Sequence, residues 1–214
     1  MVERMEYSLT KELNATMEEL VCVKRLCALN LKPRGVPSKR PDHRKPSTII
    51  DDFLYHGNIG HAQNIDLLKQ LDIQHILNVC DEELNQEILD HFDVLWINID
   101  DDISADIRKH FEQSNNFLHL NQQKGEKVLV HCKMGISRSS AIILAYLMNY
   151  RYKNLYAAYD YLLQCRRVAL PNAAFFLHLV RYENELSISK TNDSSQLPME
   201  SSPGQFDLKT ESAN

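Results

Sequence analysis

One stretch, residues 127–150, constrains the fold of this chain more than any other. It opens with the apolar run KVLV, passes through a short loop that contains Gly135, and ends in the long apolar pattern at 138–150. A short apolar run bounded by a turn is typical of a buried strand, and a longer periodic run is typical of a helix. The stretch therefore predicts a strand, a tight loop and a helix, the unit from which parallel sheets are built.

The same alternation continues through 48–186, which we interpret as one domain. Further strands are predicted at 53–55 (a short edge strand), 73–79 and 94–99, and helices at 62–71, 83–91, 104–123, 138–150, 153–165 and 171–186. Ser104 is expected to cap the helix at 104–123, and Pro171 suits the first turn of the last helix. This pattern predicts an α/β fold, with a central, mainly parallel, twisted sheet of about four to five strands flanked by helices.

Three flanking regions differ from this domain in composition. Residues 1–31 place Leu9 and Leu20 at helical spacing and predict an isolated helical segment that continues through 14–20. Residues 32–47 hold six basic side chains between four prolines and predict an extended linker. Such a run can dock an acidic groove on a kinase partner, direct nuclear entry or serve only as a solvated tether. Residues 187–214 are rich in serine and predict a disordered tail.

Composition narrows the classes of partner and compartment. The net charge of -5 argues against a general attraction to nucleic acid. The apolar run at 141–148 is too short to cross a bilayer, and residues 1–4 lack the apolar stretch of a secretory signal. We therefore expect a cytoplasmic or nuclear protein without membrane insertion. Five cysteines without regular spacing or a CxxC pair argue against a disulfide scaffold and a zinc site, and we expect neither metal nor cofactor. The oligomeric state stays open.

The loop between the strand and the helix at 127–150 carries the pattern Cys-x5-Arg, from Cys132 to Arg138. We expect backbone N–H groups to turn inward around one tetrahedral anion, from Lys133, Met134, Gly135, Ile136, Ser137 and Arg138. The helix that starts near Arg138 adds unpaired N–H groups and the positive end of its dipole. Arg138 offers a planar, charged fork for two phosphate oxygens. These features favour a thiolate at Cys132, which would be a nucleophile facing phosphorus.

A single cysteine before a helix is often only a small buried hydrophobe. Here the sequence HCKMGISRS at 131–139 resembles the signature HCxxGxxRS of the protein tyrosine phosphatase superfamily, in its dual-specificity branch, and its loop is also slingshot-like. The resemblance spans 48–186. The segment DFLYHGN at 52–58 is similar to the family's opening LYLGS with two changes, and the stretches at 76–79, 145–148 and 170–175 also resemble the family.

The resemblance implies a general acid, an aspartate on a loop upstream of the cysteine. Three aspartates follow the strand at 94–99, and counting back from Phe111 selects Asp101, with Asp100 and Asp102 as alternatives. An acidic solvated turn would look similar. The resemblance also implies that the Ser139 hydroxyl donates a hydrogen bond to the cysteine sulfur, although a serine in the first turn of a helix is common.

Three further residues have weaker roles. His131 either holds the loop and tunes the thiolate or is a structural hydrogen-bonding residue, and Asn78 is expected to brace the loop from the neighbouring strand. Cys80 and Cys132 each follow directly on a strand, and parallel neighbours end at the same edge of a sheet. Cys80 is therefore a candidate to capture oxidised Cys132 as a disulfide, as a cysteine in a matching position does in some members of the superfamily. It is otherwise a small buried hydrophobe.

The expected reaction is phosphate release from phosphoproteins through a phosphocysteine. The segment from 53 to Asp101 has no room for the long phosphotyrosine-recognition loop of the classical tyrosine phosphatases. A shallow pocket that admits phosphoserine, phosphothreonine and phosphotyrosine is expected. One alternative is a phosphoinositide or glucan phosphatase, although Lys133 is the only basic residue between Cys132 and Arg138. The other is a non-catalytic module that binds phosphoproteins.

Overall fold

The computed structural model describes residues 2–32 and 44–194 and contains a five-stranded sheet. The strands are β1 (Ser47–Ile50), β2 (Leu54–Asn58), β3 (His75–Asn78), β4 (Asp93–Trp96) and β5 (Val128–Cys132). They lie in the order β1-β2-β5-β3-β4, with β1 antiparallel to β2 and the other neighbours parallel. The predicted α/β class with a mainly parallel sheet is confirmed.

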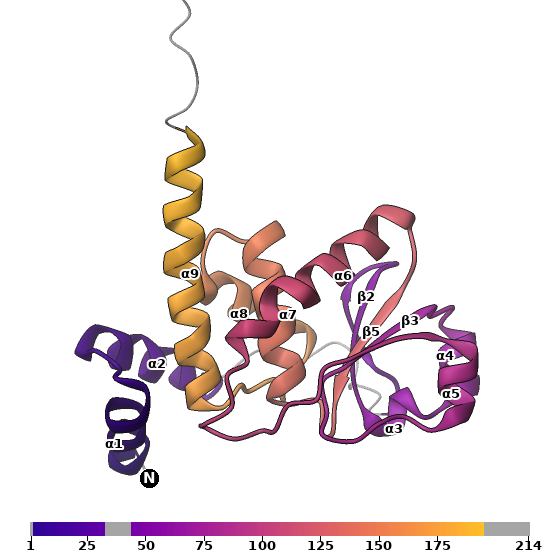
Figure 1. Cartoon of the computed structure of the whole chain (residues 1–214), viewed down its shortest axis with the longest axis horizontal. Coiled ribbons are helices and arrows are strands. Elements are labelled where there is room, and N and C mark those ends of the chain that lie inside the picture. Colours follow the sequence, from indigo (N-terminus) through magenta and orange to yellow (C-terminus); the bar gives the residue numbers. More distant parts are fainter. Residues whose placement is uncertain (1, 33–43, 195–214) are drawn as a thin grey trace, which may run out of the picture.

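Helices cover both faces of this sheet (Figure 1). Those described are α1 (Val2–Leu13), α2 (Met17–Leu29), α3 (Ile59–Ala62), α4 (Ile65–Gln70), α5 (Gln86–His91), α6 (Phe111–Lys124), α7 (Arg138–Tyr150), α8 (Leu155–Cys165) and α9 (Ala173–Ser194), with a 3-10 turn at Arg108–His110. The small helices α3, α4 and α5 lie on one face, and α6 to α9 lie on the other.

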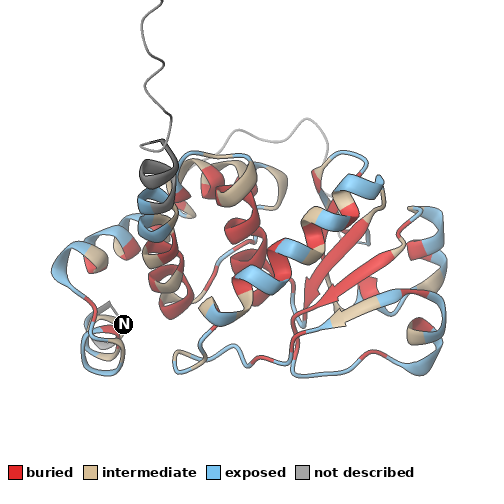
Figure 2. Ribbon diagram, turned by 45° about the horizontal axis from the view of Figure 1, so that its top comes forward, coloured by how far each residue is buried: buried red, intermediate tan, exposed pale blue. Residues whose placement is uncertain are grey.

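Side-chain alternation along the strands explains the two hydrophobic cores. On β5, Leu129 joins the core beneath α3, α4 and α5, whereas Val128 and Val130 join the larger core beneath the long helices. On β3, Ile76 and Leu77 divide in the same way. Figure 2 shows β2, β5 and β3 buried along their length. Central parallel strands therefore read as continuous apolar runs, which is why the sequence reveals them.

The expected edge strand at 53–55 is wrong in its position. β2 lies inside the sheet, between β5 and the antiparallel strand β1, which sequence reasoning missed. β1 is short and follows Pro46, so it carried too little apolar pattern to be distinguished from the linker. β2 nevertheless pairs with β5 from Leu54 to Asn58, which brings it next to the end of β5 at Cys132.

Two helix starts also differ from expectation. The helix expected at 62–71 is two short helices, each capped by an asparagine, Asn58 and Asn64. Ser104 caps no helix, because it donates its own hydrogen bonds to the carboxylate of Asp102, and α6 begins only at Phe111. Pro171 precedes α9, where the Phe175 amide donates a hydrogen bond to the side chain of Asn172 at 2.9 Å.

The N-terminal segment is helical but not isolated. Asn14 adopts a φ of 51° and breaks the expected single helix, and Thr16 starts α2 through a capping box with Glu19. α2 buries four apolar side chains in the larger core, Leu20, Val23, Leu26 and Leu29. Arg181 of α9 binds the Glu19 carboxylate at 2.8 Å and the Leu13 carbonyl at 2.9 Å. The expectation of an isolated segment is therefore wrong.

Most of the expected linker, 33–43, and the last part of the expected tail, 195–214, lie outside the described residues. The disorder expected from 187 is wrong for residues 187–194, because α9 continues to Ser194. Within the described ranges, no helix is long and apolar enough to cross a membrane.

Candidate active site

The loop after β5 surrounds the sulfur of Cys132 with hydrogen-bond donors. Cys132 is 1% exposed. Its Sγ accepts hydrogen bonds from the Gly135 amide at 3.2 Å and from the Ser139 hydroxyl at 3.1 Å. Both donors stabilise negative charge on sulfur, because a hydrogen bond to the charged form favours that form. The structure thus places the Ser139 hydroxyl at the Cys132 sulfur, and the nucleophilic role of Cys132 stays a prediction.

Gly135 lets the loop turn against the neighbouring backbone. Its φ is 65°, and a Cβ there would come within 2.3 Å of the Gly57 carbonyl oxygen and 2.6 Å of Arg166 Nη2. Any other residue would therefore displace the loop. The Arg166 Nε donates to the Gly135 carbonyl at 2.8 Å. Sequence reasoning missed Arg166, which belongs to a segment that carries no motif.

The remaining loop residues differ in exposure and in the contacts they make. The side chains of Lys133 and Met134 are exposed, and Lys133 Nζ lies 3.4 Å from a carboxylate oxygen of Glu82. The Ile136 carbonyl accepts from the Leu170 amide at 2.8 Å, which ties the loop to the segment before α9. The loop thus lies between β2, the start of α7 and the segment that contains Leu170.

Arg138 is held in place by a carboxylate that sequence reasoning did not consider. Its Nη1 donates to Asp81 Oδ1 at 2.7 Å and to the Ile99 carbonyl at 3.0 Å. Its Nε is buried and has no hydrogen-bond partner within 2–32 and 44–194. Burial opposes the charged guanidinium, but the hydrogen bond to Asp81 and the ionisable groups nearby outweigh it and raise the pKa of Arg138. Arg138 in turn holds the pKa of Asp81 below its usual range.

Of the three consecutive aspartates, Asp101 is the one that contacts the loop. Its Oδ1 accepts from the Ser137 hydroxyl at 2.7 Å and from Asn172 Nδ2 at 2.9 Å. Asp102 instead accepts two hydrogen bonds from Ser104 and is turned to its own loop. We call the loop from Cys132 to Arg138 the cradle. The structure thus brings Asp101 to the cradle, although it lies 36 residues before Ser137 in the sequence.

A buried histidine lies behind Ser139. His56 Nε2 is 2.8 Å from the Ser139 Oγ, and His56 is fully buried on β2. Burial, with Arg166 nearby, lowers the pKa of His56 well below its usual value. Sequence reasoning missed His56. The signal that could have identified it is its position, because the resembled opening LYLGS has leucine where this chain has His56.

The three residues with weaker expected roles lie beneath the cradle. Burial lowers the pKa of His131 to about 3, and its Nδ1 is 3.9 Å from Cys80 Sγ. Burial and then Cys132 raise the pKa of Cys80 to about 12, so Cys80 is a neutral thiol near Cys132. Its redox role stays a prediction.

Asn78 does not brace the loop directly. Its side chain donates to the Glu82 carbonyl at 2.9 Å and accepts from the Cys80 amide at 3.0 Å, so it closes the turn after β3. Because that turn carries Asp81, Asn78 acts on the cradle only through the partner of Arg138.

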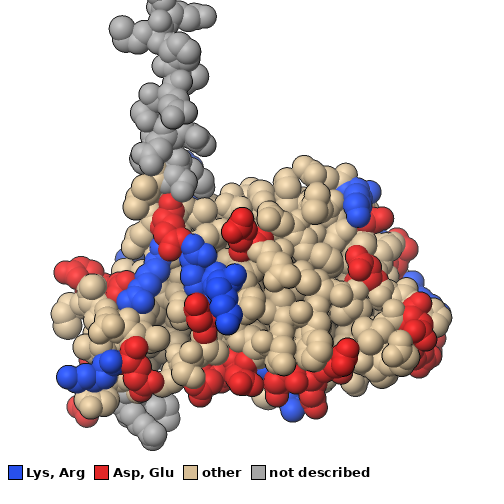
Figure 3. Space-filling view, viewed as in Figure 1, with Lys and Arg blue, Asp and Glu red and all other residues tan. Residues whose placement is uncertain are grey.

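The surroundings of the cradle are acidic. Carboxylates follow β3 at Asp81 and Glu82 and follow β4 at 100–102. Figure 3 shows acidic side chains along the lower edge of the molecule. No group of three or more candidate metal ligands occurs in the described part of the chain.

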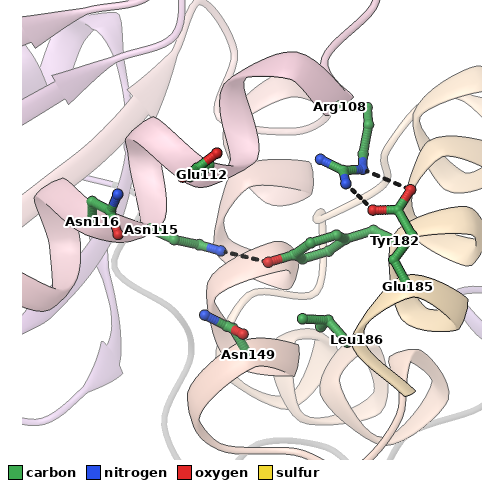
Figure 4. A pocket seen from close by; sticks show the side chains of 8 residues that line it. All are labelled: Arg108, Glu112, Asn115, Asn116, Asn149, Tyr182, Glu185 and Leu186. Carbon is green, nitrogen blue, oxygen red and sulfur yellow. Dashed lines mark hydrogen bonds and ion pairs between the residues drawn. The ribbon is translucent and has the colours of Figure 1, made fainter. Parts of the chain in front are cut away.

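Away from the cradle, a hollow of about 250 Å³ lies between α6, α7 and α9 (Figure 4). Across it Arg108 pairs with Glu185, and the amide of Asn115 donates to the Tyr182 hydroxyl at 3.0 Å. Asn149 places it at the carboxyl end of α7, whereas the cradle is at the other end of that helix. Its lining contains no cysteine, serine or histidine, and it is not a candidate for the chemistry of Cys132.

Residues 54–185, more than half of the chain, match the family model "Dual specificity phosphatase, catalytic domain". The chain is 39% identical over 163 residues to dual specificity protein phosphatase 5 of Homo sapiens, which covers 75% of this chain and 42% of that protein. It is 34% identical over 178 residues to protein phosphatase Slingshot homolog 1 of Homo sapiens. This match covers 76% of this chain and 16% of that protein. The chain thus spans less than half the length of these curated relatives.

Solved structures show the same likeness. A mouse putative dual specificity phosphatase complexed with zinc tungstate superposes with a TM-score of 0.64 and 28% identity, over 74% of this chain and 97% of that one. A human tyrosine phosphatase-like serine/threonine/tyrosine-interacting protein gives a TM-score of 0.62 and 29% identity, over 66% and 97%.

Proposed function

Since the chain belongs to the dual specificity phosphatase family, we propose that it hydrolyses phosphoserine, phosphothreonine and phosphotyrosine on proteins through a phosphocysteine. The observation that supports this most directly is the pair of hydrogen bonds from Gly135 and Ser139 to the Cys132 sulfur. They favour a nucleophilic thiolate at the floor of a loop whose rim carries Arg138.

In the first step, Cys132 attacks phosphorus in line and the substrate oxygen leaves. The loop amides and the Arg138 guanidinium hold the equatorial oxygens, whose charge grows in the transition state. A phosphate would replace Asp81 as a partner of Arg138, since both are oxyanions. The guanidinium is already in position because Asp81 and the Ile99 carbonyl orient it.

Asp101 supplies the proton to the leaving oxygen and then removes one from the attacking water. Ser137 and Asn172 both bond its Oδ1, which leaves Oδ2 for the substrate oxygen. In the second step the water releases phosphate, and the Ser139 hydroxyl stabilises the departing thiolate of Cys132.

The site disfavours the two alternatives. A phosphoinositide headgroup carries several phosphates, whereas here the loop's Lys133 faces Glu82 at 3.4 Å and acidic residues surround the cradle. A binding module needs no nucleophile or general acid, whereas Cys132, Arg138 and Asp101 are assembled together. Docking to a kinase-pathway protein and the cytoplasmic or nuclear location stay predictions.

The substrate class is tested by phosphate release from three panels at equal concentration. They are peptides with phosphoserine, phosphothreonine or phosphotyrosine, soluble phosphoinositides, and phosphorylated glucan. We expect release from all three kinds of peptide, and much slower release from the other panels. Preference for an inositol phosphate over every peptide would contradict the proposed substrate class.

The change Asp101→Asn is expected to slow hydrolysis of phosphoserine peptides by roughly a hundredfold or more, the usual contribution of a general acid. The loss should be smaller for aryl phosphates with good leaving groups, which need little protonation. Asp102→Asn is the matched control, because Asp102 binds Ser104 instead. The assignment fails if Asp102→Asn slows hydrolysis of phosphoserine peptides and Asp101→Asn keeps the wild-type rate.

We also propose that His56 positions Ser139. If the Ser139 hydroxyl donates to Cys132 Sγ, its oxygen is left to accept from His56 Nε2–H at 2.8 Å. Burial keeps His56 neutral, so one ring nitrogen is a donor. A chain of hydrogen bonds polarises its members, which makes Ser139 a better donor to the leaving thiolate.

The change His56→Leu is expected to lower kcat about fivefold to tenfold, as loss of one buried hydrogen bond does. The slowed step should be hydrolysis of the phosphocysteine, seen as a larger burst of p-nitrophenol before steady state. In the Ser139→Ala background the same change should have no further effect, since the hydroxyl it acts on is gone. An equal loss in both backgrounds would mean that His56 does not act through Ser139.

A further inference from the structure

A hollow of about 540 Å³ opens beside the candidate active site. Asp101 and Ser137 form one wall of it, and residues 170–173, which lead into the start of α9, form another. The opposite side comes from the N-terminal helices, through Met5 of α1 and Cys27, Asn30 and Leu31 at the end of α2. The hollow is therefore built from two parts of the chain, only one of which lies within the matched family segment 54–185.

The N-terminal wall is held rigidly against the rest of the molecule. α2 lies beside α9 in Figure 1, and its buried face shares the larger core with α7 and α9. The ion pair between Arg181 and Glu19 and the hydrogen bond from Arg181 to the Leu13 carbonyl fix the turn between α1 and α2. These contacts therefore place α2 against α9, with its carboxyl end beside the hollow.

The lining of the hollow is mostly apolar. Leu31 is 83% exposed and Leu170 is 37% exposed, and the half-buried Met5 adds further apolar surface. Asp101 is the one charged side chain among the lining residues, and its Oδ1 is engaged by Ser137 and Asn172. Exposed apolar side chains gathered in a hollow mark a place where apolar groups bind.

We infer that this hollow is a subsite for an apolar side chain of the phosphoprotein substrate, close in sequence to the phosphorylated residue. The inference rests on the proposed function and adds to it a preference for the neighbouring residue. The occupant is part of the substrate because the hollow is continuous with the proposed phosphate site: Ser137 belongs to the phosphate loop, and Asp101 faces the leaving oxygen. An extended peptide advances about 3.3 Å per residue, so side chains a few positions away pass over the hollow.

The test compares phosphotyrosine peptides of serine and glycine that differ only in one leucine, placed in turn at each of the four positions on either side. We expect one or two positions to raise kcat/KM about tenfold, as burial of one large apolar side chain does. In the full chain, Leu31→Asp should remove this preference, and Leu31→Lys should shift it toward a peptide with aspartate at the same position. Neither change should disturb folding, since Leu31 is exposed.

The matched control is Val21→Asp, on α2, the helix that ends two residues before Leu31; Val21 is 60% exposed and does not line the hollow. It should keep the wild-type preference for leucine. Turnover of the peptides without any positional preference, or a preference that survives Leu31→Asp, would overturn the subsite and leave the proposed function intact. If the wild type hydrolyses no phosphopeptide at all, the proposed function itself is overturned.

Discussion

Replacing Cys132 with serine is expected to abolish turnover of phosphopeptides and of small aryl phosphates alike. A serine hydroxyl is not ionised in this environment, so the nucleophile that forms the phosphocysteine is lost. Removal of a nucleophile in a group-transfer enzyme costs at least about a thousandfold in rate. The fold should persist, because the serine oxygen can accept the same hydrogen bonds from Gly135 and Ser139 that the sulfur accepts.

The same variant separates binding from chemistry. Arg138 and the loop amides are unchanged in Cys132→Ser, so phosphopeptides should still bind, and the variant should retain phosphoproteins on a column. Vanadate, which resembles phosphate, should displace them. The matched control is Cys165→Ser, a cysteine on α8 outside the cradle, which should keep wild-type turnover. Turnover by Cys132→Ser near the wild-type rate would rule out the proposed mechanism.

The second large effect is expected from Arg138→Met. Methionine has a similar length and fills the apolar part of the space, but it cannot hold phosphate oxygens. Loss of a preorganised donor to a developing oxyanion costs roughly 3–4 kcal/mol, or about a hundredfold to a thousandfold in kcat. Binding of vanadate, measured by inhibition, should weaken in parallel because Arg138 contacts the same oxygens.

Arg138→Lys distinguishes charge from geometry. Lysine keeps one positive charge but lacks the planar fork, so most of the loss should remain. Asp81 stays partly solvated in both variants, and the free energy of unfolding should change little, as measured by urea denaturation. Recovery of wild-type kcat in Arg138→Lys would show that the charge alone is sufficient and that the fork has no role.

Local sequence was enough to predict the centre of the molecule. β5, the loop and α7 occupy one continuous stretch, and the position of each donor in it follows from the chain's own geometry. Cys132 and Arg138 could therefore be proposed together from the residues, whereas the role of Ser139 came from the resemblance to a family. The central strands β3 and β5 were identifiable because burial on both faces leaves a continuous apolar run. Asp101 required the resemblance to a family, since three adjacent aspartates have no pattern of their own.

Contacts between distant segments gave no such signal. His56 reaches Ser139 across 83 residues, Asp81 reaches Arg138 across 57, and Asn172 reaches Asp101 across 71. The first two contacts form because strand order places β2 and β3 on either side of β5. The third forms because the segment before α9 lies beside the loop that carries Asp101. The wall that α1 and α2 add to the hollow depends in the same way on packing against α9. Periodicity describes which face of an element is apolar, but it does not describe which other element covers that face.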